Sequence, residues 1–180
     1  MMLLVDIGNT NIVYALYDGN NYILNKRMLP KNNLEHIMNE LSHYTINYVA
    51  IASVVPNITN QYLKQFKEKF NIEPFVVSYK NANIKLIVDS NKEVGPDRIC
   101  NVKAAIKKTD KNCIVIDFGT ATTYDVINDK KEFIGGAIAP GIQVSGTYLI
   151  EKAALLQNTA LEFPEKYIGK NTKTNIQSGI

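Results

Sequence analysis

The sequence has few cysteines and no long hydrophobic run, and each shortage excludes a class of protein. Its two cysteines, Cys100 and Cys113, lack CxxC spacing, so no disulfide framework or zinc site is expected, and both are predicted to be reduced core residues. No run of about 18 apolar residues occurs, which excludes a transmembrane helix. The apolar start, residues 1–5, has neither a preceding basic region nor a following cleavage site, so we expect no secretory signal and a cytoplasmic location.

The chain also lacks a large excess of charge of either sign. The chain carries 20 Lys and Arg residues against 17 Asp and Glu residues, and its formal charge of +3 is spread without a block of like charges. A nucleic-acid partner is therefore not expected. The two histidines, His36 and His43, have no companion metal ligands, and we expect both at the surface.

Hydrophobic periodicity predicts an α/β protein. In the first half it indicates strands at 3–7, 12–17, 22–29, 48–55 and 75–77, with helices at 34–41 and 58–70. In the second half it indicates helices at 97–108 and 142–156, strands ending near 118 and at 122–127 and 132–139, and a helix start at 171–180. Such an order suits mixed sheets flanked by helices.

The opening sequence pattern of the chain returns in its second half. Val5-Asp6-Ile7-Gly8-Asn9-Thr10 is echoed by Ile116-Asp117-Phe118-Gly119-Thr120-Ala121, each between two predicted strands. This repeat predicts a pseudo-twofold protein with a cleft between its halves. The later strand, helix and strand of the first half have no counterpart in the second half, so we expect the second half to be incomplete. Its sheet would then have unpaired edges, and we expect a fold that is marginally stable or supported by oligomerisation.

Both repeated turns have the chemistry of a phosphate-binding hairpin. In each, a carboxylate ends a strand, a glycine permits a tight turn, and amide or hydroxyl side chains follow. Asp6 could hold the Mg²⁺ that accompanies ATP, and the segment 117–123 could grip the same nucleotide from the other side. The alternative for the first turn alone is an ordinary hairpin with Asp and Asn as turn formers.

Two other kinase architectures are excluded. Asp117-Phe118-Gly119 resembles the magnesium-binding triplet of protein kinases, but the glycine-rich loop, the strand lysine and the His-Arg-Asp loop of those enzymes are absent. The chain also lacks a Gly-x-x-x-x-Gly-Lys-Ser/Thr segment, which excludes a P-loop.

Gly95-Pro96-Asp97-Arg98 opens a predicted helix and has two interpretations. Proline in the first turn with a nearby Asp is ordinary helix capping. Alternatively, Asp97 accepts a proton from a substrate hydroxyl while Arg98 binds an anionic group. The Gly- and Pro-rich segment 135–141 is either a tight connection between strand and helix or a loop that a ligand can approach closely.

Five motifs follow one another along the chain. They are Asp-Ile-Gly-Asn-Thr, Gly-x-Asp-Arg, Asp-Phe-Gly-Thr-Ala-Thr-Thr, Gly-Gly-x-Ile-x-Pro-Gly, and the terminal Asn171-Thr172 with Ile176-Gln177-Ser178-Gly179. Taken in this order, they resemble the motifs of type III pantothenate kinases over nearly the whole chain. The resemblance implies two ribonuclease-H-like (actin-like ATPase) domains with mixed five-stranded sheets, at residues 1–110 and, incomplete, at 111–180. It also implies phosphorylation of pantothenate by ATP, the first step of coenzyme A synthesis, in a homodimer that uses Mg²⁺ and K⁺ or NH₄⁺.

The resemblance also implies roles for particular residues. Asp97 would be the catalytic base, and Asp117 would hold the monovalent cation. The residues that would contact ATP are Asp6, Ile7, Gly8, Asn9, Thr10, Asn11, Ile12, Val13 and Thr120. Those that would bind pantothenate are Gly95, Pro96, Asp97, Arg98 and Thr172.

One departure from the family pattern concerns the acceptor pocket, because Val88 stands where the family usually has a tyrosine that contacts pantothenate. Other functions remain open at this point. A sugar or carboxylate kinase or a phosphohydrolase could use the same two hairpins, and a regulator resembling the Bvg accessory factors would share the fold.

Overall fold

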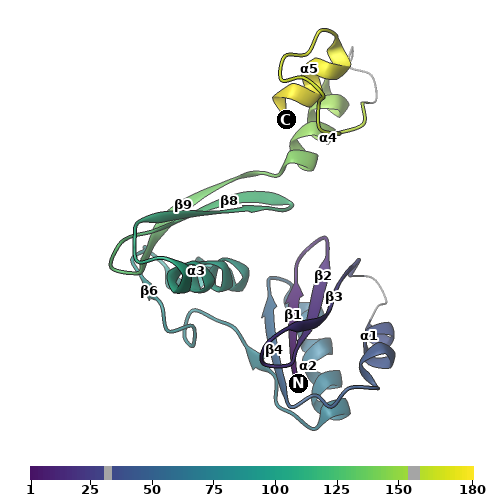
Figure 1. Cartoon of the computed structure of the whole chain (residues 1–180), viewed down its shortest axis with the longest axis vertical. Coiled ribbons are helices and arrows are strands. Elements are labelled where there is room, and N and C mark those ends of the chain that lie inside the picture. The colour runs from purple at the N-terminus through teal and green to yellow at the C-terminus, as the bar shows by residue number, and fades with distance from the viewer. Residues whose placement is uncertain (31–33, 154–158) are drawn as a thin grey trace. The chain divides into compact units, whose positions relative to one another are not determined.

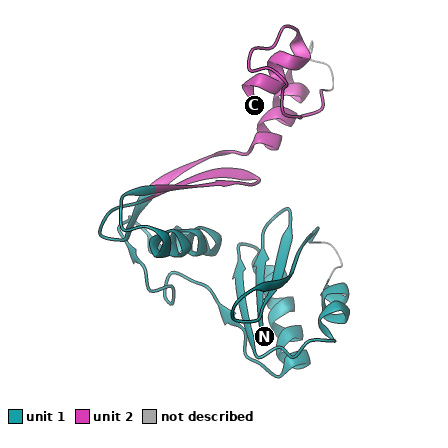
Figure 2. Ribbon diagram, in the orientation of Figure 1, with its two compact units in different colours: residues 1–113, 127–135 teal, residues 114–126, 136–180 magenta. Residues whose placement is uncertain are grey.

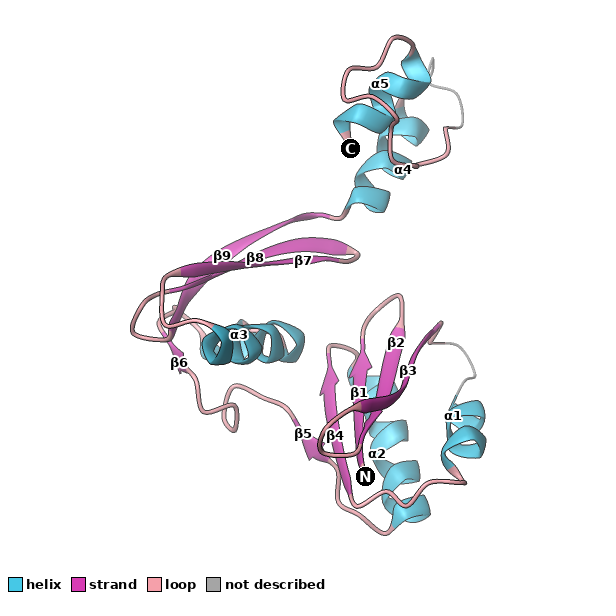
Figure 3. Cartoon of the chain, viewed as in Figure 1, coloured by secondary structure: helices cyan, strands magenta, loops and turns pink. Residues whose placement is uncertain are grey.

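The computed structural model describes residues 1–30, 34–153 and 159–180, and these form two compact units (Figure 2). The first unit comprises residues 1–113 and 127–135, and the second comprises residues 114–126 and 136–180. Mixed sheets flanked by helices confirm the predicted α/β fold (Figure 3).

The first unit contains a five-stranded sheet in the order β3-β2-β1-β4-β5 (Figure 1). Its strands are β1 (Met2–Ile7), β2 (Ile12–Tyr17), β3 (Tyr22–Met28), β4 (Tyr48–Ser53) and β5 (Phe75–Val76). Strand β1 pairs antiparallel with β2 and parallel with β4, so it is hydrogen-bonded on both edges. The predicted strands were therefore correct to within about two residues at each end.

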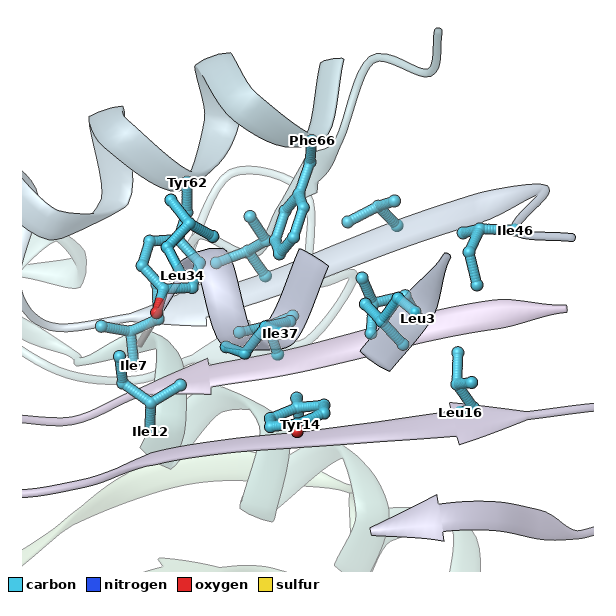
Figure 4. Close-up of a cluster of buried hydrophobic side chains, with 14 residues drawn as sticks. Leu3, Ile7, Ile12, Tyr14, Leu16, Leu34, Ile37, Ile46, Tyr62 and Phe66 are labelled. Carbon is cyan, nitrogen blue, oxygen red and sulfur yellow. The ribbon is translucent and has the colours of Figure 1, made fainter. Parts of the chain in front are cut away.

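One face of this sheet forms the core of the first unit. Alternate residues of β1 and β2 point to the same face, and helices α1 (Leu34–Leu41) and α2 (Pro56–Phe70) cover it (Figure 4). The buried residues that these elements contribute include Leu3, Val5, Ile7, Ile12, Tyr14, Leu16, Leu34, Ile37, Leu41, Tyr62 and Phe66. Both histidines are exposed, as predicted.

Where β1 and β4 pair, the opposite face of the sheet carries two alanines and one carboxylate. Asp6 pairs with Ala52, and Leu4 pairs with Ala50, so these four residues share the face that points away from α1 and α2. Helix α3 (Pro96–Lys108) packs against β4. Because alanine side chains are small, Ala50 and Ala52 let α3 pack closely against β4.

The remaining strands form a sheet in the order β6-β9-β8-β7. These are β6 (Lys85–Leu86), β7 (Cys113–Phe118), β8 (Ala121–Ile127) and β9 (Glu132–Pro140). The two-residue strand β6 was not predicted, because two residues are too few to show a period. Strand β7 lies at the edge, and Ile114, Ile116 and Phe118 on it are exposed.

Short helices complete the chain. They are the 3₁₀ turn η1 (Asn91–Glu93) and helices α4 (Ile142–Lys152) and α5 (Thr172–Gly179). The predicted end of the fourth helix, residues 154–156, lies outside the described residues. Within the described part of the chain, every helix is too short or too polar to cross a membrane.

The core of the first unit contains one hydroxyl that supports a stability prediction. Tyr62 is buried, its hydroxyl has no hydrogen-bond partner among the described residues, and burial raises its pKa to about 12. Tyr62→Phe removes this unsatisfied group and keeps the ring. We expect the free energy of unfolding to stay unchanged or to rise by up to about 1 kcal/mol in denaturant titrations.

Tyr14→Phe is the matched control, because the buried Tyr14 hydroxyl donates to Glu40, which also pairs with Lys26 at 2.5 Å. Loss of a hydrogen bond to a charged group should lower the free energy of unfolding by about 1 to 2 kcal/mol. Equal destabilisation by both substitutions would mean that the Tyr62 hydroxyl has a partner.

Candidate active site

The hairpin between β1 and β2 places Asp6 at the end of a buried strand. The turn is closed by a hydrogen bond from the Gly8 amide to the Asn11 carbonyl, at 2.9 Å. Asp6 is exposed on the face opposite the core. Ile7 and Ile12 are fully buried in that core, so only their backbone could contact ATP, whereas Asn9 and Thr10 are exposed in the turn.

Asp97 lies in the first turn of α3, directly after Pro96. Its Oδ1 accepts a hydrogen bond from the Arg98 amide at 2.8 Å. The capping interpretation is thus correct for one carboxylate oxygen. Gly95 is the N-cap of the helix, and a Cβ there would overlap Asp97 Oδ1 and lie 3.6 Å from a Val54 methyl group. Glycine here leaves the space of a side chain to the Asp97 carboxylate.

The Cys100 thiol lies near two carboxylates, those of Asp6 and Asp97. Cys100 follows Asp97 by three residues on α3, which places both on one side of the helix. Partial desolvation, and then the negative charges of Asp6 and Asp97, raise the pKa of the Cys100 thiol. Asp6 and Asp97, 91 positions apart in the sequence, are therefore close to the same thiol.

The prediction that Cys100 is a core residue was wrong. Cys100 is exposed, and the residues of α3 that face the interior are Ile99 and Val102. The apolar neighbours of Cys100 in the sequence gave a misleading signal, because only some positions of a helix face its core.

The Arg98 guanidinium lies over an aromatic ring. Its central carbon is 5.4 Å from the centre of the Phe133 ring on β9, and Phe133 is buried. Sequence patterns gave no sign of this pair. Val88 is half-buried and follows β6, the strand that pairs with β9.

In the second unit, the hairpin between β7 and β8 packs tightly against the start of α4. The Gly141 amide donates to the Thr120 carbonyl at 2.9 Å. A Cβ on Gly141 would overlap the Gly119 carbonyl oxygen and lie 2.6 Å from that of Thr120. Residues 135–140 of the predicted Gly- and Pro-rich segment belong to β9, and Gly141 alone forms the tight connection to α4, with a close backbone approach.

A cavity of about 600 Å³ adjoins this hairpin. Its lining residues include Phe118 and Gly119 from the hairpin and Gln143 and Thr147 from α4. Helix α4 begins at Ile142, and its N-cap Gly141 provides no side-chain cap, so the first amides and the positive end of the helix dipole suit an anion. The second unit can thus offer a hollow with the character of a phosphate site.

Three predicted site residues of the second unit lie at element ends. Asp117 and Thr120 are exposed on either side of Gly119. Thr172 is the first residue of α5, whose N-cap Asn171 forms a reciprocal capping box with Thr174.

The carboxylate of Asp6 suits a magnesium ion that arrives with a nucleotide. No group of three or more His, Cys, Asp or Glu side chains could enclose a metal among residues 1–30, 34–153 and 159–180. Magnesium commonly binds through one or two carboxylates together with substrate phosphates and water. A single exposed carboxylate beside a tight turn, as at Asp6, matches that mode.

The mixed sheets flanked by helices define an α/β fold, with one Asp-containing hairpin in each unit. Two solved structures share its fold. A Campylobacter jejuni protein assigned to the Baf family of transcriptional activators has a TM-score of 0.58 at 20% identity, covering 99% of this chain and 73% of that one. A Sinorhizobium meliloti protein assigned as a 2-dehydro-3-deoxygalactonokinase has a TM-score of 0.51 at 10% identity, covering 86% of this chain and 58% of that one.

The chain belongs to the type III pantothenate kinase family, whose sequence model matches residues 2–180. Among its relatives, the type III pantothenate kinase of Exiguobacterium sp. (strain AT1b) is 38% identical, over 99% of this chain and 75% of that protein. That of Geotalea daltonii is 35% identical, over 100% of this chain and 75% of that protein. The predicted family is confirmed, and it is favoured over the sugar kinase, phosphohydrolase and regulator alternatives.

Alanine substitutions at the two tight glycines, Gly95 and Gly141, should lower stability by different amounts. Both have backbone angles open to alanine, with φ −59° and ψ 145° at Gly95 and φ −66° and ψ 161° at Gly141. Gly141→Ala meets backbone atoms that cannot rotate away, so the free energy of unfolding should fall by about 2 kcal/mol. Gly95→Ala meets the end of one side chain, so the loss should stay below about 1 kcal/mol.

Denaturant unfolding followed by circular dichroism measures both changes. A Gly141→Ala protein as stable as the parent would show that the hairpin and α4 do not approach as closely as described.

Proposed function

We propose that the chain transfers the γ-phosphate of ATP to the primary hydroxyl of pantothenate, giving 4′-phosphopantothenate, the first step of coenzyme A synthesis. The family match over residues 2–180 is the observation that carries this proposal. The position of Asp6 and Asp97 near one thiol supports it further, because a phosphoryl transfer needs a metal-binding carboxylate and a proton acceptor at the same place.

Arg98 binds the carboxylate of pantothenate in this proposal. A guanidinium presents a planar fork of donors that matches a carboxylate. Gly95 and Pro96 line the same end of α3, and Thr172 contributes a further contact to the acceptor. Val88 provides no aromatic contact to pantothenate at the position where the family usually has a tyrosine.

Asp97 is the proposed general base. Its Oδ1 is engaged by the Arg98 amide, which fixes the carboxylate, and Oδ2 is left to accept the hydroxyl proton of the acceptor. As that proton moves to Oδ2, the acceptor oxygen bonds to the γ-phosphorus. The bond between this phosphorus and the β,γ-bridging oxygen breaks, and ADP leaves with the electron pair. Since the transition state is loose, positioning matters more than the strength of the base.

Asp6 is the proposed magnesium-positioning carboxylate, and the ion would supply neutralising charge at the β- and γ-phosphates. The hairpin residues 6–13 contact ATP through backbone amides and exposed polar side chains. In the second unit, Thr120 contacts ATP, and Asp117 holds a monovalent cation, K⁺ or NH₄⁺.

Further proposals concern the state of the protein and its domains. It would act as a homodimer in the cytoplasm, with no nucleic-acid partner. The domains proposed from the sequence, residues 1–110 and 111–180, would each contribute one acidic hairpin.

Asp97→Asn separates catalysis from capping. Asparagine keeps the shape and can still accept the Arg98 amide, but it cannot accept a proton at neutral pH. We expect kcat to fall by roughly 10² to 10⁴-fold in a coupled ADP-release assay with pantothenate, with the Kd of ATP unchanged. Retention of more than about a tenth of the parental kcat would reduce Asp97 to a structural residue.

Asp6→Asn is the contrasting variant. Loss of a magnesium-positioning carboxylate should weaken the binding of Mg·ATP as well as the rate, so calorimetry should show a higher Kd for this variant alone. If both variants lowered kcat without any change in nucleotide Kd, Asp6 would not be a magnesium residue.

A further inference from the structure

Phe133 is a buried aromatic residue with a cationic neighbour. It is 1% exposed, and the Arg98 guanidinium carbon lies 5.4 Å from the centre of its ring. This separation is within the range of about 6 Å in which a cation is attracted to an aromatic face. Guanidinium groups stack on such faces more readily than ammonium groups, because they are planar and weakly hydrated.

The β6–β9 ladder fixes the backbone position of Phe133. Phe133 pairs with Leu86 in the parallel ladder of β6 and β9, and its carbonyl accepts the Ile87 amide at 2.8 Å. The neighbouring Glu132 forms an ion pair with Lys85 and accepts a hydrogen bond from the Asn128 side chain at 2.8 Å. The ladder of β6 and β9 therefore holds the Phe133 backbone in place, and burial restricts the movement of its ring.

The stacking on Phe133 should reduce the rotamer entropy that the long Arg98 side chain loses when it binds a ligand. An unsupported arginine loses considerable rotamer entropy when it grips a ligand. A fixed ring beneath the guanidinium restricts those rotamers before the ligand arrives, and this pre-organisation improves binding without adding a contact to the ligand.

We infer that Phe133 is a positioning residue that holds the Arg98 guanidinium ready for an anionic acceptor. The inference rests on the proposed function, in which Arg98 binds the acceptor carboxylate. It assigns to β6 and β9 a role in acceptor affinity, which Phe133 exerts through Arg98.

A double-mutant cycle tests this role. Phe133→Leu keeps an apolar side chain and removes the ring face. It should raise the KM for pantothenate about three- to tenfold, with kcat changed less than twofold, because the loss is one of binding alone. In the Arg98→Lys background the same substitution should change KM less than twofold, since a compact ammonium depends little on stacking.

Ile99→Val is the matched control, because it trims another buried side chain next to Arg98 without altering the ring. Thermal unfolding of each variant shows how far the packing of α3 has loosened. A KM increase of the same size in Ile99→Val, at a similar loss of stability, would overturn the inference in favour of general loosening.

The remaining outcomes separate the two proposals. Equal KM increases from Phe133→Leu in the parent and in the Arg98→Lys background would overturn the role of Phe133, while the proposed function would stand. A folded parent protein that phosphorylates no pantothenate would overturn the proposed function itself, and the role of Phe133 with it.

Discussion

The pairing of β1 on both of its edges is the constraint on which the candidate site depends. Antiparallel bonds to β2 and parallel bonds to β4 fix which side chains of β1 face α1 and α2. Leu3, Val5 and Ile7 take the buried positions, so Asp6 must point to the other face. A shift of one residue in this register would bury the carboxylate and expose the core.

Helix α3 brings the second carboxylate to that same face. The alanines of β4 that neighbour Leu4 and Asp6 leave room for the helix, and Gly95 leaves room for the Asp97 carboxylate at its first turn. The resulting site combines one carboxylate from a strand end with another from a helix start. Rigid elements thus position both groups, as a transfer reaction governed by orientation requires.

The sequence predicted the strands, the helices and the acidic hairpins because each depends on local periodicity or turn chemistry. It could not predict β6, whose two residues pair only because β9 lies beside them. It misplaced Cys100 for a similar reason, since exposure on α3 is decided by the sheet against which the helix packs. The stacking of Arg98 on Phe133 joins residues 35 positions apart, and no pattern in either segment signals it.

The central claim is that Asp6 and Asp97 lie together, and the Cys100 thiol reports on it directly. In a Cys113→Ser background Cys100 is the sole thiol, so the pH dependence of its alkylation by iodoacetamide gives its pKa. We predict a pKa above the ordinary value of about 8.5, lowered by Asp6→Asn and also by Asp97→Asn, because each removes a negative charge. An ordinary pKa that neither substitution changes would contradict the shared site.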